Sequence, residues 1–182
     1  MDTITKLERT VLHWFKAVPH LPRGVQHWLG DNIWWITVLV AIVTGLAAMG
    51  NIFTLLGNQS VIESGSISYY ASTSFLVWAN VIATINLVFN ALTTVILAFA
   101  VVPLREKQKK GWVLVFLTLL LAVVSTVVGA IMTQNVIGFV SSILFEGIFI
   151  VVGAYFLFEV HGEFAHVERS KGVKSAKKSE DK

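Results

Sequence analysis

One ionisable residue, Glu146, interrupts an apolar stretch that is long enough to cross a membrane. The stretch covers residues 136–160, VIGFVSSILFEGIFIVVGAYFLFEV, and Glu146 lies within a few residues of its midpoint. Placing a carboxylate at the centre of a bilayer costs about 2.5 to 3.5 kcal/mol even on the milder insertion scales, so a residue of this kind marks a structural or functional site. Glu146 is therefore the candidate around which the other polar residues are considered.

Several polar side chains match Glu146 in depth. Asn86 and Asn90 flank the midpoint of another apolar stretch and share one helical face. Because amides in hydrocarbon need partners, this face is expected to point at other helices. Small residues one and two turns from Glu146 would let a neighbouring backbone approach, so Glu146 is expected to point into the bundle. The predicted buried polar cluster or transport site consists of Glu146, Asn86, Asn90, Ser142, Ser125 and Thr126.

The absence of a basic partner at this depth gives Glu146 two possible roles. Burial without a counter-charge favours the protonated acid, which can donate a hydrogen bond to an amide carbonyl and hold helices together. We therefore expect a small non-enzymatic multi-pass membrane protein that acts as a scaffold or as an accessory or assembly component. The alternative is a proton- or cation-coupled carrier or channel that uses Glu146 with Asn86 and Asn90.

The composition excludes several classes of protein. With 55% hydrophobic and 14% charged residues among 182, the chain is too apolar to cover itself as a soluble domain must. It has no cysteine, which excludes disulfides, thiolate metal sites and cysteine nucleophiles. No glycine-rich phosphate loop, Ser-His-Asp arrangement or zinc-protease signature occurs. We therefore expect neither enzymatic activity nor a cofactor.

Charge-free runs define the membrane spans. No charge occurs between Asp31 and Glu63 or between Glu63 and Arg105, and only Glu146 occurs between Lys110 and Glu159. The last run is too long for one crossing of the roughly 30 Å hydrocarbon core, so it must fold back at the polar residues 133–135. The sequence predicts an all-α integral membrane protein whose transmembrane domain, residues 32–160, is a four-helix bundle with helices at about 33–57, 74–103, 111–133 and 136–160.

The N-terminal segment, residues 1–31, is expected to lie on the membrane surface. Apolar residues recur at helical spacing from Ile4 to Val18, which predicts an amphipathic interfacial helix, although the same face could dock on the protein's own helices. Pro19 and Pro22 are expected to end this helix. A short turn over residues 24–29 would then lead to Asp31 or Asn32 as the cap of the first span.

The C-terminal segment, residues 161–182, is polar and rich in lysine. It has few apolar residues to bury, so we expect a flexible basic tail.

The positive charges give the orientation. All fourteen Lys and Arg residues fall before the first span, between the second and third, or after the fourth. Four spans place these segments on one side, which the positive-inside rule makes cytoplasmic, so the topology is N-in/C-in. We expect the plasma (inner) membrane of a prokaryote. Expected partners are the bilayer, its anionic headgroups at the cytoplasmic face, and a second copy or another membrane protein, but not nucleic acid.

Four tryptophans near the ends of the spans are expected to anchor the protein at the membrane interface, where amphipathic indoles are preferred. These anchors are Trp34, Trp35, Trp78 and Trp112.

Histidine and glutamate residues near the termini form weaker patterns. Glu159, Glu163 and His166 follow one another at helical steps and could offer metal ligands, but a single helix does not complete a site, so we predict no metal centre. His20 and His27 are expected to be solvated or to face headgroups.

Overall fold

The computed structural model describes residues 19–64, 73–132 and 136–164, and every regular element in these ranges is a helix. In chain order the helices are α2 (Arg23–Glu63), α3 (Thr73–Arg105), α4 (Lys109–Met132) and α5 (Val136–Glu159). Each is long and apolar enough to cross a membrane. The prediction of an all-helical protein with four apolar spans is therefore confirmed for the described residues. The proposed interfacial helix before Pro19 and the tail beyond Phe164 lie outside the described residues.

The first span differs from the expectation. The sequence predicted a turn over residues 24–29 and a helix over 33–57, whereas α2 runs without interruption for 41 residues from Arg23. Pro22 is its N-cap, and the Pro22 carbonyl accepts the backbone N–H groups of Val25 and Gln26 at 2.8 and 3.1 Å. No proline follows Pro22 within α2, and isolated glycines are tolerated inside a helix, so nothing in the segment ends it. At about 1.5 Å per residue, α2 is roughly twice as long as the hydrocarbon core is thick.

The second span ends slightly later than predicted. The sequence predicted a helix to about residue 103, and α3 continues through Pro103 to Arg105. A proline inside a helix disturbs the turn before it, and its own carbonyl remains a good acceptor. Here that carbonyl accepts the N–H of Gln108 at 2.8 Å, and the Leu104 carbonyl accepts the N–H of Lys107 at 3.0 Å, so the end of α3 is capped.

A tight turn joins α3 to α4. Lys107 has a φ of 53°, in the left-handed region that non-glycine residues seldom adopt. The chain then reverses so closely that a Cβ atom on Gly111 would lie 2.6 Å from the backbone nitrogen of Leu104. Glycine is therefore required at residue 111 for the two helices to approach as they do.

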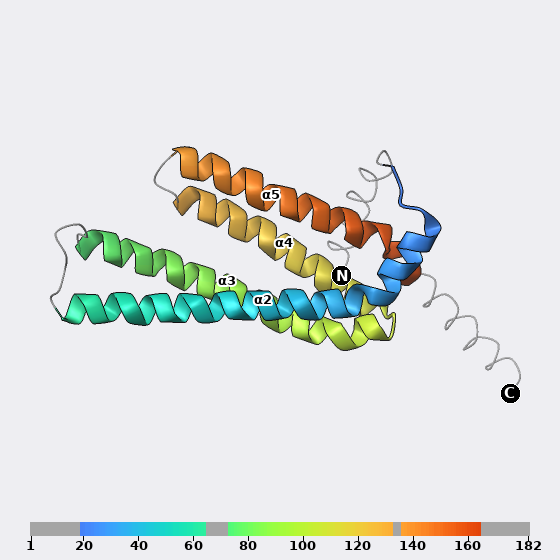
Figure 1. The fold of residues 1–182 in the computed structure, drawn as a ribbon, viewed down its shortest axis with the longest axis horizontal. Helices are drawn as coiled ribbons and strands as arrows, with labels where there is room; N and C mark the ends of the chain where they lie inside the picture. Colours follow the sequence, from blue (N-terminus) through green and yellow to red (C-terminus); the bar gives the residue numbers. More distant parts are fainter. Residues whose placement is uncertain (1–18, 65–72, 133–135, 165–182) are drawn as a thin grey trace, which may run out of the picture.

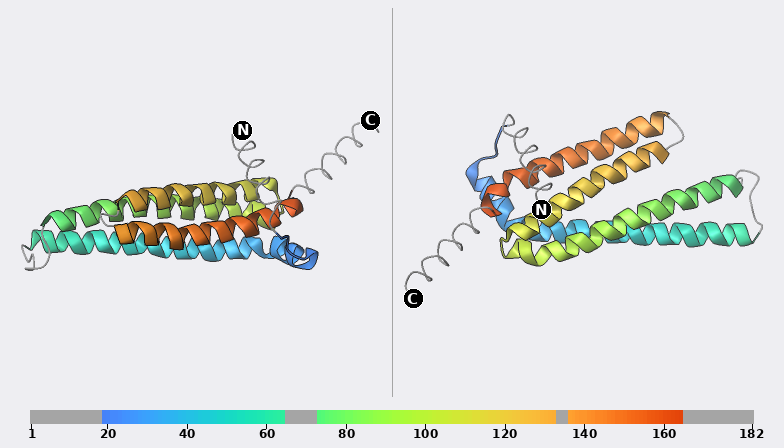
Figure 2. Two further views of the ribbon diagram at one scale, coloured as in Figure 1. Left: turned by 90° about the horizontal axis from the view of Figure 1, so that it is seen from above. Right: turned by 180° about the vertical axis from the view of Figure 1, so that it is seen from behind.

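The helices pack in sequence as antiparallel neighbours, α2 on α3, α3 on α4 and α4 on α5. Two helical hairpins result, α2–α3 and α4–α5, which meet at one end and diverge toward the other (Figure 1). Figure 2 shows the same divergence from behind. We call the closed end the basic end, because the described Lys and Arg residues all lie there: Arg23, Arg105, Lys107, Lys109 and Lys110.

The buried core lies at the basic end. Trp112 is fully buried there, with its ring stacked on Phe116 at a centroid distance of 5.4 Å and edge-on to Phe158 at 5.5 Å. The indole N–H of Trp112 donates a 2.8 Å hydrogen bond to the Leu157 carbonyl on α5. Aromatic packing and a satisfied buried donor thus hold α4 against α5.

Candidate functional site

Glu146 lies near the middle of α5 and is bonded to α4. The hydroxyl of Thr126 donates a 2.6 Å hydrogen bond to Glu146 Oε2. Thr126 itself is buried, so the bond fixes one carboxylate oxygen against the face of α4. The pair is positioned by the antiparallel packing of the two helices, which also brings Leu119 against Gly153 two turns nearer the basic end.

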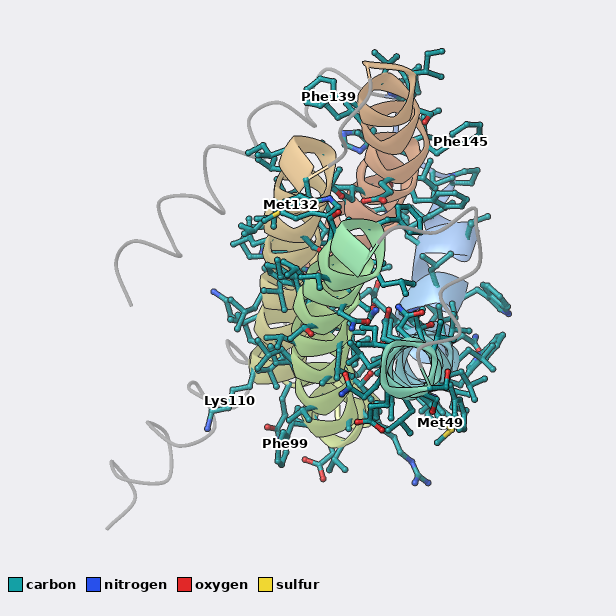
Figure 3. The ribbon with its side chains drawn as sticks, turned by 90° about the vertical axis from the view of Figure 1, so that its left-hand side faces the viewer. Met49, Phe99, Lys110, Met132, Phe139 and Phe145 are labelled. Atoms are coloured by element: carbon teal, nitrogen blue, oxygen red, sulfur yellow. The ribbon has the colours of Figure 1, made fainter. Side chains whose placement is uncertain are left out.

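The sequence predicted that Glu146 points into the bundle, whereas the single chain leaves it largely uncovered. Its side chain is exposed, and in the described part of the chain Thr126 is its hydrogen-bond partner. Phe145, the preceding residue, projects on the side of α5 away from α4 (Figure 3). Because the hairpins diverge at this level, α5 has only α4 as a packed neighbour, and the second oxygen of Glu146 has no hydrogen bond from a described residue.

The other members of the predicted polar cluster lie apart from Glu146. Asn86 and Asn90 are half-buried on α3, which packs on α2 and α4 but not along α5. Ser125 is half-buried on α4, and the side chain of Ser142 lies outside the described residues. The structure therefore brings together Thr126 and Glu146, while a joint role of the whole cluster stays a prediction.

Polar contacts between α2 and α3 use different residues. The hydroxyls of Thr44 and Thr94 lie 2.9 Å apart, and the amide of Asn58 donates to Asn80 Oδ1 at 2.8 Å. These bonds tie the first hairpin together at the middle of α2 and toward the end of α2 remote from the basic end. Neither bond involves the second hairpin.

A cavity of about 620 Å³ lies between the two hairpins, near the basic end. We call it the inter-hairpin cavity; residues of all four helices line it, among them Thr37 of α2, Leu97 of α3, Ala122 of α4 and Gly153 of α5. Glu146 is four residues before the lining residue Ile150 and seven before Gly153, so it shares their helical face. Glu146 therefore lies on the face of α5 that lines the cavity, about one helical turn farther from the basic end than Ile150.

Glu159, at the end of α5, accepts three contacts from the segment that leads into α2. His20 Nδ1 lies 2.8 Å from Oε1, the Leu21 N–H donates to Oε2 at 3.0 Å, and the Gln26 amide donates to Oε2 at 2.7 Å. The Glu159 side chain is only 5% exposed. We call these contacts the clasp, because they close the basic end between the first and last described helices.

Further ionic contacts surround the clasp. Glu163 lies 3.3 Å from His27 Nδ1, and Asp31 pairs with Lys107 of the α3–α4 turn. The Tyr155 hydroxyl donates to the Pro19 carbonyl at 2.8 Å. His20 and His27 are exposed, as predicted for solvated side chains, but both pair with glutamates that the sequence placed more than 130 residues away.

The predicted tryptophan anchors have different surroundings. Trp112 is corrected from an interface anchor to a core residue, because it is fully buried. Trp34 is half-buried under the Arg105 guanidinium, 5.7 Å from its ring centroid, and Trp35 is exposed and bonded to Asn32. Trp78 is half-buried on α3. A role as anchors stays a prediction for these last three residues.

Within residues 19–64, 73–132 and 136–164, no group of three histidine or acidic residues is arranged to hold a metal ion. Both carboxylate oxygens of Glu159 and Oε2 of Glu163 make the contacts described above. His166, the third residue of that pattern, lies outside the described residues.

Comparison with protein-family models, with curated proteins and with solved structures finds no match to the chain.

Proposed function

We propose that this protein is a non-enzymatic, multi-pass membrane protein that serves as a scaffold or accessory component of a membrane assembly. The observation that carries the proposal is the exposure of Glu146 in the middle of α5. In a bilayer, such a carboxylate is stable when it faces a protein partner or water, not when it faces lipid. A helix of a partner subunit or of a second copy would supply the missing hydrogen-bond donor.

The divergence of the hairpins supports the same proposal. Their outer halves leave one side of α5 without a packed neighbour, and interhelical hydrogen bonds are a recognised source of helix association in membranes. The bond from Thr126 fixes the carboxylate on α5, so that its second oxygen is presented without further rearrangement.

The proposed membrane is the plasma (inner) membrane of a prokaryote, with both termini cytoplasmic. The clustering of the described basic residues at one end supports this orientation through the positive-inside rule. Arg105, Lys109 and Lys110 are then placed to meet anionic headgroups.

Two substitutions at one residue test the assembly proposal. Glu146→Leu removes hydrogen bonding, and Glu146→Gln retains it without titration. We expect the Leu variant to fold but to run as a smaller particle in mild detergent, measured by light scattering after size exclusion, while the Gln variant keeps the wild-type size. Equal sizes for wild-type and folded Leu variant overturn the proposal. Glu63→Leu is the matched control, because Glu63 is an exposed carboxylate at the end of α2.

A proton- or cation-coupled carrier is the second candidate. It is favoured by one observation, the alignment of Glu146 with the face of α5 that lines the inter-hairpin cavity. The Glu146→Gln variant separates the two candidates. If it folds and assembles normally yet abolishes a pH-driven flux that the wild-type protein supports in liposomes, the carrier is the correct account. If neither protein supports a flux, the carrier loses its support.

A further inference from the structure

We infer that the inter-hairpin cavity binds one hydrocarbon chain of a bilayer lipid. Its lining holds no charged and no amide side chain; apart from four threonines it is formed by aliphatic, aromatic and glycine residues. Its volume, about 620 Å³, falls within the range of roughly 300 to 1,000 Å³ typical of small-molecule sites. An apolar cavity of this kind is not filled favourably by water. The inference does not depend on the role of Glu146.

The threonines do not make the cavity a polar site. Thr37 donates its hydroxyl proton to the Ile33 carbonyl at 2.8 Å, Thr44 donates to the Val40 carbonyl at 3.0 Å, and Thr118 donates to the Val115 carbonyl at 2.8 Å. Three of the four hydroxyl protons are therefore already used within their own helices. A polar ligand would lose its bonds to water and gain few in return.

The shape of the cavity favours a flexible chain over a helix from another protein. Its lining extends from Leu29 to Thr44 on α2, about 22 Å along the helix, and from Phe149 to Leu157 on α5, about 12 Å. A membrane-crossing helix of about 30 Å is longer than this lining, whereas part of an acyl chain fits within it.

The outer surface of the helices around the cavity is apolar. α2 and α5 both line the cavity but do not pack against each other along their lengths. Val43 of α2 and Val152 of α5 are both exposed. Lipid chains are the apolar groups that such a surface meets in a membrane.

The test uses the full-length protein in nanodiscs made of phosphatidylglycerol that carries a photoreactive diazirine in the middle of one acyl chain. Crosslinked peptides are mapped by mass spectrometry. We expect adducts on Ile150 and Leu157, which line the cavity and are half-buried and buried, in excess over those on Phe145, which is exposed but does not line it. Equal labelling of the three residues, or stronger labelling of Phe145, overturns the inference.

Substitutions that fill the cavity complete the test. Ala122→Phe places a ring in the cavity, and Ala98→Phe makes the same change on an exposed residue of α3. We expect the Ala122 variant to lose the cavity adducts and the Ala98 variant to keep them. Should the first variant fail to fold, Gly153→Leu serves instead, because the nearest atom to a new Cβ there is 3.9 Å away. Cavity adducts that persist at wild-type level in a folded filled variant contradict the inference.

Discussion

The side-chain amide of Gln26 donates a 2.7 Å hydrogen bond to Glu159 Oε2, and so joins the first turn of α2 to the last residue of α5. The same carboxylate also bonds His20 and the Leu21 N–H, and it is almost completely buried. A buried carboxylate stabilises the fold only while all of its hydrogen-bond donors are bonded to it. A donor that loses this partner stays buried without the water molecule that it would bond in the unfolded chain, and this costs free energy. The clasp is therefore expected to contribute to holding the two hairpins together at the basic end.

Loss of the clasp should destabilise the protein strongly. Glu159→Ala removes the acceptor of three contacts, and hydrogen bonds to a charged group contribute about 1.5 to 3 kcal/mol, so a decrease of at least that size is expected in the free energy of unfolding. An SDS titration of the purified protein in mixed micelles measures it. Glu163→Ala is the control: its partner His27 is exposed, and the pair should contribute less than about 1 kcal/mol. Equal losses for the two variants would show that the clasp has no special importance.

The close approach of α3 and α4 can be tested at Gly111. A Cβ there would lie 2.6 Å from a backbone nitrogen, which cannot move aside as a flexible side chain can. Gly111→Ala is therefore expected to cost about 1 to 3 kcal/mol, as other overpacking substitutions do. Gly129→Ala on the same helix meets no atom within 4 Å and should leave stability unchanged or raise it slightly. The same SDS titration checks both variants, and a neutral Gly111→Ala would refute the tight turn.

Burial of Trp112 gives a third prediction. Trp112→Phe leaves the Leu157 carbonyl without its indole donor and opens space in the aromatic core, so a loss of about 1 to 3 kcal/mol is expected. Trp28→Phe changes an indole that is 54% exposed and should have little effect on unfolding. Iodide quenching of tryptophan fluorescence provides a second readout. The quenchable fraction should fall in the Trp28 variant and not in the Trp112 variant.

The sequence was sufficient for the number and class of the helices but not for their arrangement. Charge-free runs identify spans because an ionised group in hydrocarbon is costly, and this reasoning placed α3, α4 and α5 within a few residues of their observed bounds. It failed at the start of α2, where polar residues continue the helix beyond the apolar run. Nothing in the spacing of the prolines distinguishes a helix that starts at Arg23 from one that starts near Asp31.

Part of the candidate site could also be predicted from the sequence. Equal depth along the predicted helices made Thr126 a possible donor to Glu146, and the hydrogen bond is present. The divergence of the hairpins was not foreseen, because helix faces that meet protein and faces that meet lipid are both apolar in a membrane protein. The clasp was also missed. It joins residues more than 130 positions apart, and the only signal was a set of polar residues near the two helix ends.

Membrane orientation is directly testable, because the chain has no cysteine and single-cysteine variants need no background removal. Gln59→Cys lies near the end of α2 that is remote from the basic end, and Gln108→Cys lies in the α3–α4 turn. With both termini in the cytoplasm, a membrane-impermeant maleimide is expected to label the Gln59→Cys variant in intact cells. The Gln108→Cys variant should be labelled only after permeabilisation. The reverse pattern would invert the proposed topology.

The assembly proposal is tested most directly by site-specific photocrosslinking next to Glu146. A benzoylphenylalanine in place of Ile143 lies one turn from Glu146 on the same face of α5, whereas one in place of Leu144 lies on the opposite face. Both residues are exposed, so the pair is matched in accessibility. We predict a discrete protein adduct from Ile143 that is absent from Leu144 and is lost when Glu146→Leu is added. Adducts of equal yield from the two positions, or an Ile143 adduct unaffected by Glu146→Leu, would contradict the account.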